Sequence, residues 1–258
     1  MAARRGRKLW ITLLVVVVVL GALYVVADRI AAYAAARTVA TQVKKELVAR
    51  DITTPSDPTV TIGGFPFLTQ VARGHYDKIT IHVDHPSSQG VALDALDVVA
   101  SGVNAPTSAL INRTGTVTAD TVTGTATLGW AGVNKLMNTS GFGGSGATAS
   151  ARPDGQVQVR VPVSVAGFST TVIATGTLVP VGQGLIRLKI NNVATEGGDL
   201  PPVISRLVGT IEQSLSIDIK IPPLPYHLVI KDVKATPQGA TVTATGANVP
   251  IVGGGTGP

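Results

Sequence analysis

The sequence predicts an α+β fold, in which antiparallel β-strands pack against amphipathic helices and follow one apolar N-terminal helix. Three observations support this prediction. Residues 9–27 contain no charged side chain, which is typical of a transmembrane or signal helix. Residues 156–165 alternate valine with mostly polar side chains, which is the pattern of a strand with one buried face. Residues 28–50 and 203–215 repeat apolar side chains every three or four positions, as amphipathic helices do.

The N-terminal segment is long enough to cross a membrane. As a helix, residues 9–27 extend about 28 Å, close to the roughly 30 Å of a bilayer's hydrocarbon core. A basic tail at residues 4–8 precedes this run, which predicts a cytoplasmic N-terminus and an extracytoplasmic body. The competing interpretation is a signal peptide cleaved at the small residues 32–36, with secretion to the periplasm. We favour an uncleaved single-pass anchor, because those sites lie well beyond a long apolar run.

Four segments follow from these patterns. Residues 1–27 are expected to form the cytoplasmic basic tail and the transmembrane or signal helix, and residues 28–50 an amphipathic helix. Residues 51–250 are expected to form a β-rich extracytoplasmic domain, on which the amphipathic helix packs. Residues 251–258 form a glycine-rich tail that we expect to be flexible. One large domain therefore accounts for the exported part of the chain.

Composition excludes several classes of protein. The 258 residues are 45% hydrophobic and only 14% charged, so a sizeable core is available. No cysteine is present, which excludes disulfides, thiol catalysis and zinc-thiolate sites. The net charge of +6 comes largely from the N-terminal tail, and aromatic residues make up 4% of the chain. A nearly neutral body with few aromatic side chains is unlike a nucleic-acid-binding protein.

Within the domain, alternating side chains predict a meander of antiparallel strands. The expected strands are residues 59–62, 75–83, 91–103, 114–128, 156–165, 168–179, 185–190, 216–221, 228–233 and 240–249. A short helix is expected over residues 130–138, followed by a glycine-rich loop over 140–146. Threonine fills much of the stretch 114–128, which suits a sheet with one polar face.

The rest of the chain is organised around residues 59–83. Here a strand meets the Gly63-Gly64 pair, where the backbone is free to turn, and a second strand follows a short apolar element. Phe65, Leu68 and Val71 recur at three-residue spacing within that element and give it one apolar face. A turn that contributes to the core is the simplest interpretation of this pattern.

The motif G-G-F-P-F-L-T-Q-V at residues 63–71, followed by R-G-x-Y-D-K-I-x-I at 73–81, resembles the signature of the LmeA-like phospholipid-binding family of actinobacterial cell-envelope proteins. The resemblance extends over most of the chain. It implies an extracytoplasmic, elongated, strongly curved sheet or barrel wrapped around helices, like the tubular TULIP and bactericidal-permeability-increasing domains. It also implies binding of phospholipids of the phosphoinositide (phosphatidylinositol) type and support of lipoglycan (mannan) assembly in the envelope.

The sequence contains no recognised catalytic or metal-binding constellation. In a strand, His82 and Asp84 share a face, whereas His85 points away, so a metal site is not expected there. Asp94 and Asp97 fall on opposite faces of a regular strand, which argues against a pair of catalytic carboxylates. The glycines at 140–146 lack the lysine and hydroxyl of a nucleotide loop. We therefore predict a protein that is not an enzyme and needs no metal or cofactor.

The remaining feature is a series of aliphatic faces, which predicts an apolar channel that holds the acyl chains of membrane phospholipids. The predicted lining residues are Phe65, Phe67, Leu68, Val71, Trp130, Leu136, Met137, Leu207, Ile211 and Leu215. Three alternatives stay open at this point. The same side chains can fill a solid core, the protein can be a non-enzymatic envelope scaffold that docks a membrane glycosyltransferase, or it can be a hydrolase with an unrecognised site.

Overall fold

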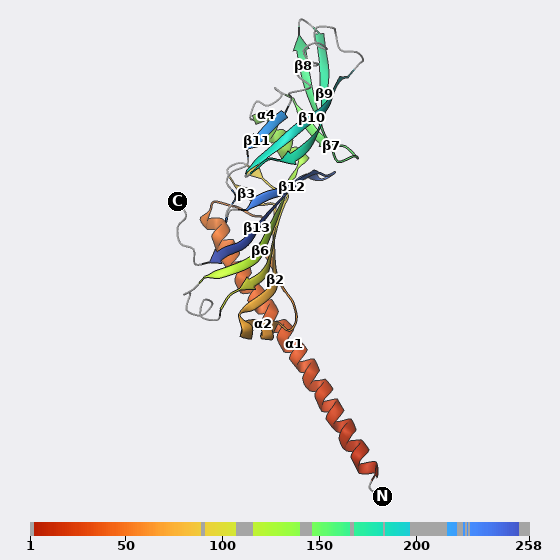
Figure 1. Ribbon diagram of the computed structural model, residues 1–258, viewed down its shortest axis with the longest axis vertical. Helices are drawn as coiled ribbons and strands as arrows, with labels where there is room; N and C mark the ends of the chain where they lie inside the picture. The colour runs from red at the N-terminus through yellow and green to blue at the C-terminus, as the bar shows by residue number, and fades with distance from the viewer. Residues whose placement is uncertain are drawn as a thin grey trace.

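The computed structural model describes residues 3–88, 91–106, 116–139, 146–165, 168–182, 184–196, 216–220, 224, 226 and 228–252. It has an α+β fold, with one long helix, two shorter helices and two antiparallel sheets. The helices are α1 (Ala3–Ala49), α2 (Phe67–Arg73) and α4 (Trp130–Thr139). The molecule is elongated, and the apolar half of α1 projects from one end of the body (Figure 1).

The first sheet has six strands, and all its pairings are antiparallel. In spatial order they are β1 (Thr59–Gly63), β2 (His75–Asp84), β5 (Ala95–Asn104), β6 (Val117–Gly129), β13 (Gly239–Val252) and β12 (Val229–Ala235). A two-stranded ribbon of β3 (Ser87–Ser88) and β4 (Val91–Ala92) lies in the connection between β2 and β5.

The second sheet has five strands and is also antiparallel. Its spatial order is β11 (Ser216–Lys220), β10 (Leu185–Thr195), β9 (Phe168–Pro180), β8 (Val157–Val165) and β7 (Thr148–Ala151). The expected strands are confirmed, except that 91–103 is divided into β4 and β5 and that residues 114–115 and 221 lie outside the described residues. Strands β7 and β3 were not expected. The predicted helix 203–215 lies outside the described residues, as does the predicted loop except for Gly146.

Neither sheet closes into a barrel within the described part of the chain, so the barrel alternative of the fold prediction is wrong. Closure requires the two edge strands of a sheet to pair with each other. Here one edge strand of the six-stranded sheet, β1, contacts α1, and the other, β12, contacts β9 of the second sheet. The two edge strands do not pair with each other, so the sheet stays open. Strong curvature and a TULIP-like wrap remain predictions.

The six-stranded sheet has one apolar face and one threonine-rich face. Cross-strand neighbours in the register Ile62, Ile79, Ala100 and Val122 form an apolar row that packs in a common core. The adjacent register places Thr61, Thr80, Val99, Thr123 and Thr245 in a row on the opposite face. The polar face predicted for the threonine-rich segment is therefore confirmed, because side chains alternate between the faces of a strand.

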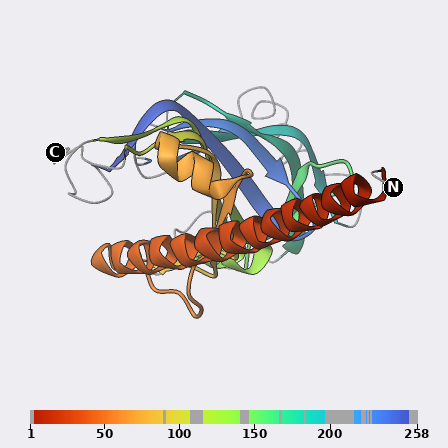
Figure 2. The ribbon, with the colours of Figure 1, turned by 90° about the horizontal axis from the view of Figure 1, so that it is seen from below.

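Helix α1 is continuous from Ala3 to Ala49, and its two halves have different surroundings. The apolar half is exposed along its whole length and is long and apolar enough to cross a membrane. Beyond it, Ala31, Ala32 and Ala35 pack against the core of the six-stranded sheet. Their short side chains let the helix axis approach the strands closely. Seen from below, α1 crosses in front of the strands and α2 lies beside it (Figure 2).

Candidate functional site

The most extensive chemical feature of the body is a continuous series of apolar clusters that crosses both sheets. The first cluster lies between α1, α2 and the six-stranded sheet and includes Phe67, Tyr76 and Val103. The second surrounds Ile186 and Ile230, where the two sheets meet. The third lies between α4 and the five-stranded sheet, around Val157, Val159, Leu188 and Ile190.

Two leucines join these clusters. Leu228 packs against both the first and the second cluster, and Leu178 packs against both the second and the third. The three clusters together with Leu228 and Leu178 are called the apolar track below. It runs from α2 at the end of the body near the apolar half of α1 to α4 farther along the long axis (Figure 1).

Much of the track is only half-buried. On the apolar face of the six-stranded sheet, this holds for Val98 and Val242. The register places half-buried Ile81, Leu96 and Ala126 on the same face, outside the three clusters. Half-buried aliphatic side chains keep apolar area that another apolar molecule can cover, and covering it stabilises by about 25 cal/mol per Å². The track therefore combines a buried core with half-buried apolar area that another apolar molecule could cover.

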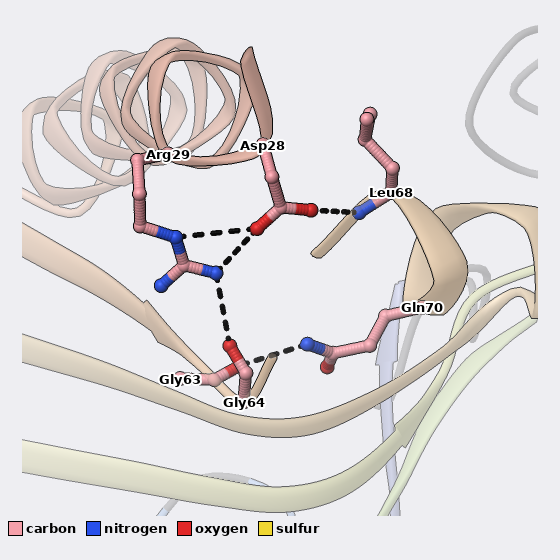
Figure 3. Close-up of polar contacts among 6 residues, drawn as sticks. All are labelled: Asp28, Arg29, Gly63, Gly64, Leu68 and Gln70. Carbon is pink, nitrogen blue, oxygen red and sulfur yellow. Dashed lines mark hydrogen bonds and ion pairs between the residues drawn. The ribbon is translucent and has the colours of Figure 1, made fainter. Parts of the chain in front are cut away.

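At the α2 end, the track adjoins a small network of buried polar groups (Figure 3). The side chain of Asp28, in α1, is fully buried, and its Oδ1 accepts a hydrogen bond from the backbone N–H of Leu68 at 2.8 Å. Pro66 precedes α2 and supplies no side-chain cap, so the carboxylate of Asp28 caps this helix from α1. Arg29 donates to Asp28 Oδ2 from Nε at 3.2 Å and from Nη2 at 2.5 Å.

The pKa of the Asp28 carboxyl group reflects opposing effects. Burial alone raises this pKa, because the charged form loses its hydration. Hydrogen bonds from the Leu68 and Phe67 backbone and from the Arg29 side chain, together with the charge of Arg29, outweigh burial and lower the pKa overall. Asp28 is thus held as a carboxylate just beyond the apolar run.

A second buried polar side chain fixes the turn before α2. Gln70 donates from Nε2 to the carbonyl of Gly63 at 3.1 Å, and its Oε1 accepts from the N–H of Asp77 at 2.9 Å. Arg29 Nη2 also donates to the Gly64 carbonyl at 3.3 Å. Gly64 has φ +86°, and a Cβ there would lie 2.6 Å from Gln70 Nε2. The two glycines and the glutamine of the sequence motif therefore build one turn.

The predicted residues of this segment fall into two groups. Phe67 is 5% exposed and packs on the ring of Tyr76, with 6.2 Å between centroids, and Val71 packs against the same cluster. Phe65 and Leu68 instead remain 58% and 38% exposed on the outside of the turn. The structure thus brings only part of the predicted apolar face into the track. A role of any of these residues in binding stays a prediction.

The other predicted residues lie at the far end of the track or outside the described part. Trp130 and Met137 of α4 pack against the third cluster, and the indole Nε1 of Trp130 donates to the Thr236 carbonyl at 2.9 Å. The side chain of Leu136 is not among those described. Three predicted residues, Leu207, Ile211 and Leu215, lie outside the described residues.

His82 has one partner, Asp97, that sequence reasoning missed, because strand pairing was needed to find it. The register places His82 opposite Asp97, whose Oδ1 lies 2.6 Å from Nδ1, and Asp84 Oδ1 lies 2.9 Å from Nε2. Hydrogen bonds that the His82 ring donates to the carboxylates of Asp97 and Asp84 raise the pKa of His82. Among the described residues, no group of three or more His, Cys, Asp or Glu side chains is placed to hold a metal ion.

A pocket of about 300 Å³ lies at the C-terminal end of α1, where sequence reasoning predicted no site. Its lining residues are Lys44, Leu47, Val48, Asp51, Ile52, Thr53 and Thr54. This volume is at the lower end of the range for small-molecule sites. The pocket is therefore a smaller candidate than the track.

Comparison with known proteins agrees with an apolar binding surface. The family model of LmeA-like phospholipid-binding proteins matches residues 26–245. Comparisons with curated proteins and with solved structures gave no match. The match begins next to Asp28 and includes the α2 turn and both sheets, and from this coverage we conclude that the chain belongs to the LmeA-like phospholipid-binding family.

Proposed function

We propose that this protein holds the acyl chains of phospholipids along the apolar track while α1 anchors it to a membrane. The observation that carries the proposal is the continuity of the track, from Phe67 to Trp130, within the matched region of a phospholipid-binding family. The basic tail before the apolar run supports a cytoplasmic N-terminus and an extracytoplasmic body.

The energetics of such a site require length and apolar area rather than reactive groups. Each buried methylene contributes about 0.8 kcal/mol, so a chain of 16 carbons is worth on the order of 10 kcal/mol before ordering costs. Because the sheets are open, a lipid can enter from the side of the track instead of through the mouth of a barrel. In this proposal Trp130, Leu136 and Met137 contact the acyl chain at the α4 end of the track. Leu207, Ile211 and Leu215 are proposed as further apolar contacts.

The resemblance to cell-envelope proteins supports a more specific proposal about the lipid and its role. We infer that the bound lipid is of the phosphoinositide type and that binding supports lipoglycan (mannan) assembly. Whether the protein stores or transfers lipid is decided by exchange between donor and acceptor vesicles. In this proposal, the residues named contribute apolar contacts and no chemistry.

The test uses two adjacent valines on β5. Val98 packs against the first cluster, whereas Val99 belongs to the threonine-rich row on the opposite face, and both are half-buried. The full chain and the variants Val98→Asn and Val99→Asn are purified in detergent, and bound phospholipid is counted by native mass spectrometry. We expect the wild type and Val99→Asn to retain lipid, and Val98→Asn to lose it several-fold.

Two results would overturn the proposal. One is a folded wild-type protein that neither retains nor takes up phospholipid. The other is an equal loss of lipid from the two variants at equal thermal stability, because the loss would then not depend on the face that is altered.

A further inference from the structure

The exposed apolar side chains of the α2 turn lie next to the place where the apolar half of α1 ends. Phe65 and Leu68 are 58% and 38% exposed, although Phe67 and Gln70 of the same motif are buried. The backbone N–H of Leu68 bonds directly to Asp28, the first charged residue after the apolar run. Figure 1 shows α2 at the end of the body from which this part of α1 projects.

We propose that Phe65 and Leu68 insert into the surface of the same bilayer that α1 spans, so that the α2 turn is a second membrane contact. This inference rests on the proposed anchoring by α1. A helix covering residues 9–27 is about as long as the hydrocarbon core is thick, which places Asp28 near the level of the outer headgroups. Because Asp28 contacts α2 at 2.8 Å, the exposed side chains lie at the same depth. Aromatic side chains are enriched at this level.

The surroundings of the turn suit a headgroup layer. Arg29 lies over the ring of Phe65, 5.2 Å from its centroid, and its side chain is 48% exposed. Its Nη1 has no hydrogen-bond partner among the described residues and can donate to a lipid phosphate. Ile30 and Tyr33 follow on α1 and are 64% and 60% exposed. A cation at this level is attracted to the anionic phosphates of the headgroups.

A second copy of the protein fits this surface less well. Stable protein interfaces bury on the order of 1,200 Å² or more in total. Phe65 and Leu68 of two copies would bury roughly a few hundred Å², since a whole aromatic side chain buries about 150–250 Å². A bilayer requires no such area, because α1 already holds the turn at the surface and the contact is intramolecular in effect.

The contact would also orient the binding surface. Phe67 lies between the two exposed residues in the sequence and belongs to the first cluster of the apolar track. The buried carboxylate of Asp28 and the amide of Gln70 fix the turn relative to α1 and β2. Insertion of Phe65 and Leu68 therefore holds one end of the track against the bilayer, where a lipid can pass between the two.

The test exploits the absence of cysteine from the chain. Single-cysteine variants Phe65→Cys and Leu68→Cys are labelled with an environment-sensitive nitrobenzoxadiazole dye in the full chain, reconstituted into phosphatidylcholine and phosphatidylglycerol vesicles. Glu46→Cys and Asp154→Cys are the controls. Glu46 lies 18 residues beyond Asp28 on α1, about 27 Å farther along the helix, and its side chain is 56% exposed.

We expect lipids with a shallow nitroxide to quench the dye at positions 65 and 68 at least threefold more than at 46 and 154, and aqueous iodide to show the reverse order. Equal quenching at the four positions would overturn the membrane contact. Two independent positions are used, so that a misfolded Phe65→Cys variant does not decide the result. Phospholipid bound after detergent extraction is counted on the same samples, so the contact and the proposed lipid binding can fail separately.

Discussion

The two places where helices meet the sheets are built by different means. At the α1–α2 junction, Asp28 is 0% exposed and Gln70 is 7% exposed, and both make several hydrogen bonds. At the α4 contact, apolar side chains face the third cluster, and the polar contacts are single bonds, such as Asn134 Oδ1 accepting from the Ala149 N–H at 2.6 Å. One contact depends on buried polar geometry, and the other depends mainly on apolar packing.

This difference has a functional meaning. A buried polar network is satisfied in one arrangement, since displacing a partner leaves an unpaired group away from water. Apolar surfaces tolerate repacking, because contacts without direction can be exchanged for others of similar volume. In the proposed function, the junction near the membrane holds the body in place, while the α4 end adapts to an acyl chain. The predictions below test this contrast.

Truncating the ring that connects the junction to the track should have the largest effect. Phe67 is buried against Tyr76, so we expect Phe67→Ala to lower the free energy of unfolding by about 3–5 kcal/mol. Phe65→Ala, two positions away on the exposed side, should lower it by less than about 1 kcal/mol. Urea unfolding of the detergent-solubilised full chain measures both. Equal losses of unfolding free energy would mean that the rings of Phe65 and Phe67 are equally buried.

The difference in hydrogen bonding between the α1–α2 junction and the α4 contact predicts an intermediate loss of stability. Gln70→Leu leaves the Gly63 carbonyl and the Asp77 N–H without their partner, which should cost about 1–3 kcal/mol. Asn134→Leu in α4 leaves one group, the Ala149 N–H, without its partner and should cost about 1 kcal/mol, because one group is unpaired instead of two. If Asn134→Leu is the more destabilising substitution, the two junctions do not differ as described.

Substitutions at two glycines with positive φ distinguish the stability cost of steric crowding from that of backbone strain. Gly64 has φ +86°, and a Cβ there meets the Asp77 carboxylate and Gln70, whereas Gly155 has φ +78° and no atom within 4 Å of its Cβ. Gly155→Ala should therefore cost about 1 kcal/mol from strain alone, and Gly64→Ala should cost more. Thermal unfolding compares them. A Gly64→Ala variant as stable as Gly155→Ala would show that the turn before α2 adapts.

Sequence reasoning located the elements better than it located the contacts between them. Strand alternation and the glycine pair predict β1, β2 and an apolar turn where α2 lies, because these signals are local. The cap that Asp28 supplies to α2 joins residues 40 positions apart, and no local pattern predicts it. The same holds for His82, whose partner Asp97 follows from strand register. Phe65 and Phe67 share one motif, yet only the fold assigns one to the surface and the other to the core.

The smallest predicted effect is a pH dependence on the polar face. Because hydrogen bonds from the His82 ring to Asp97 and Asp84 raise the pKa of His82 above its ordinary 6.5, the folded state binds a proton more tightly than the unfolded state. The resulting stability is fully present below about pH 6.5 and is lost as pH rises through the raised pKa. All three side chains are 39–49% exposed, so the change is expected to be small. Urea midpoints between pH 6 and 9 measure it, and Asp97→Asn should flatten the decline, since it removes the partner that raises this pKa most. Two results would contradict this: a midpoint that rises over this interval, or a decline that Asp97→Asn leaves unaltered. Either would mean that the imidazolium of His82 does not stabilise the fold, and that the threonine-rich face contributes to it only through strand pairing.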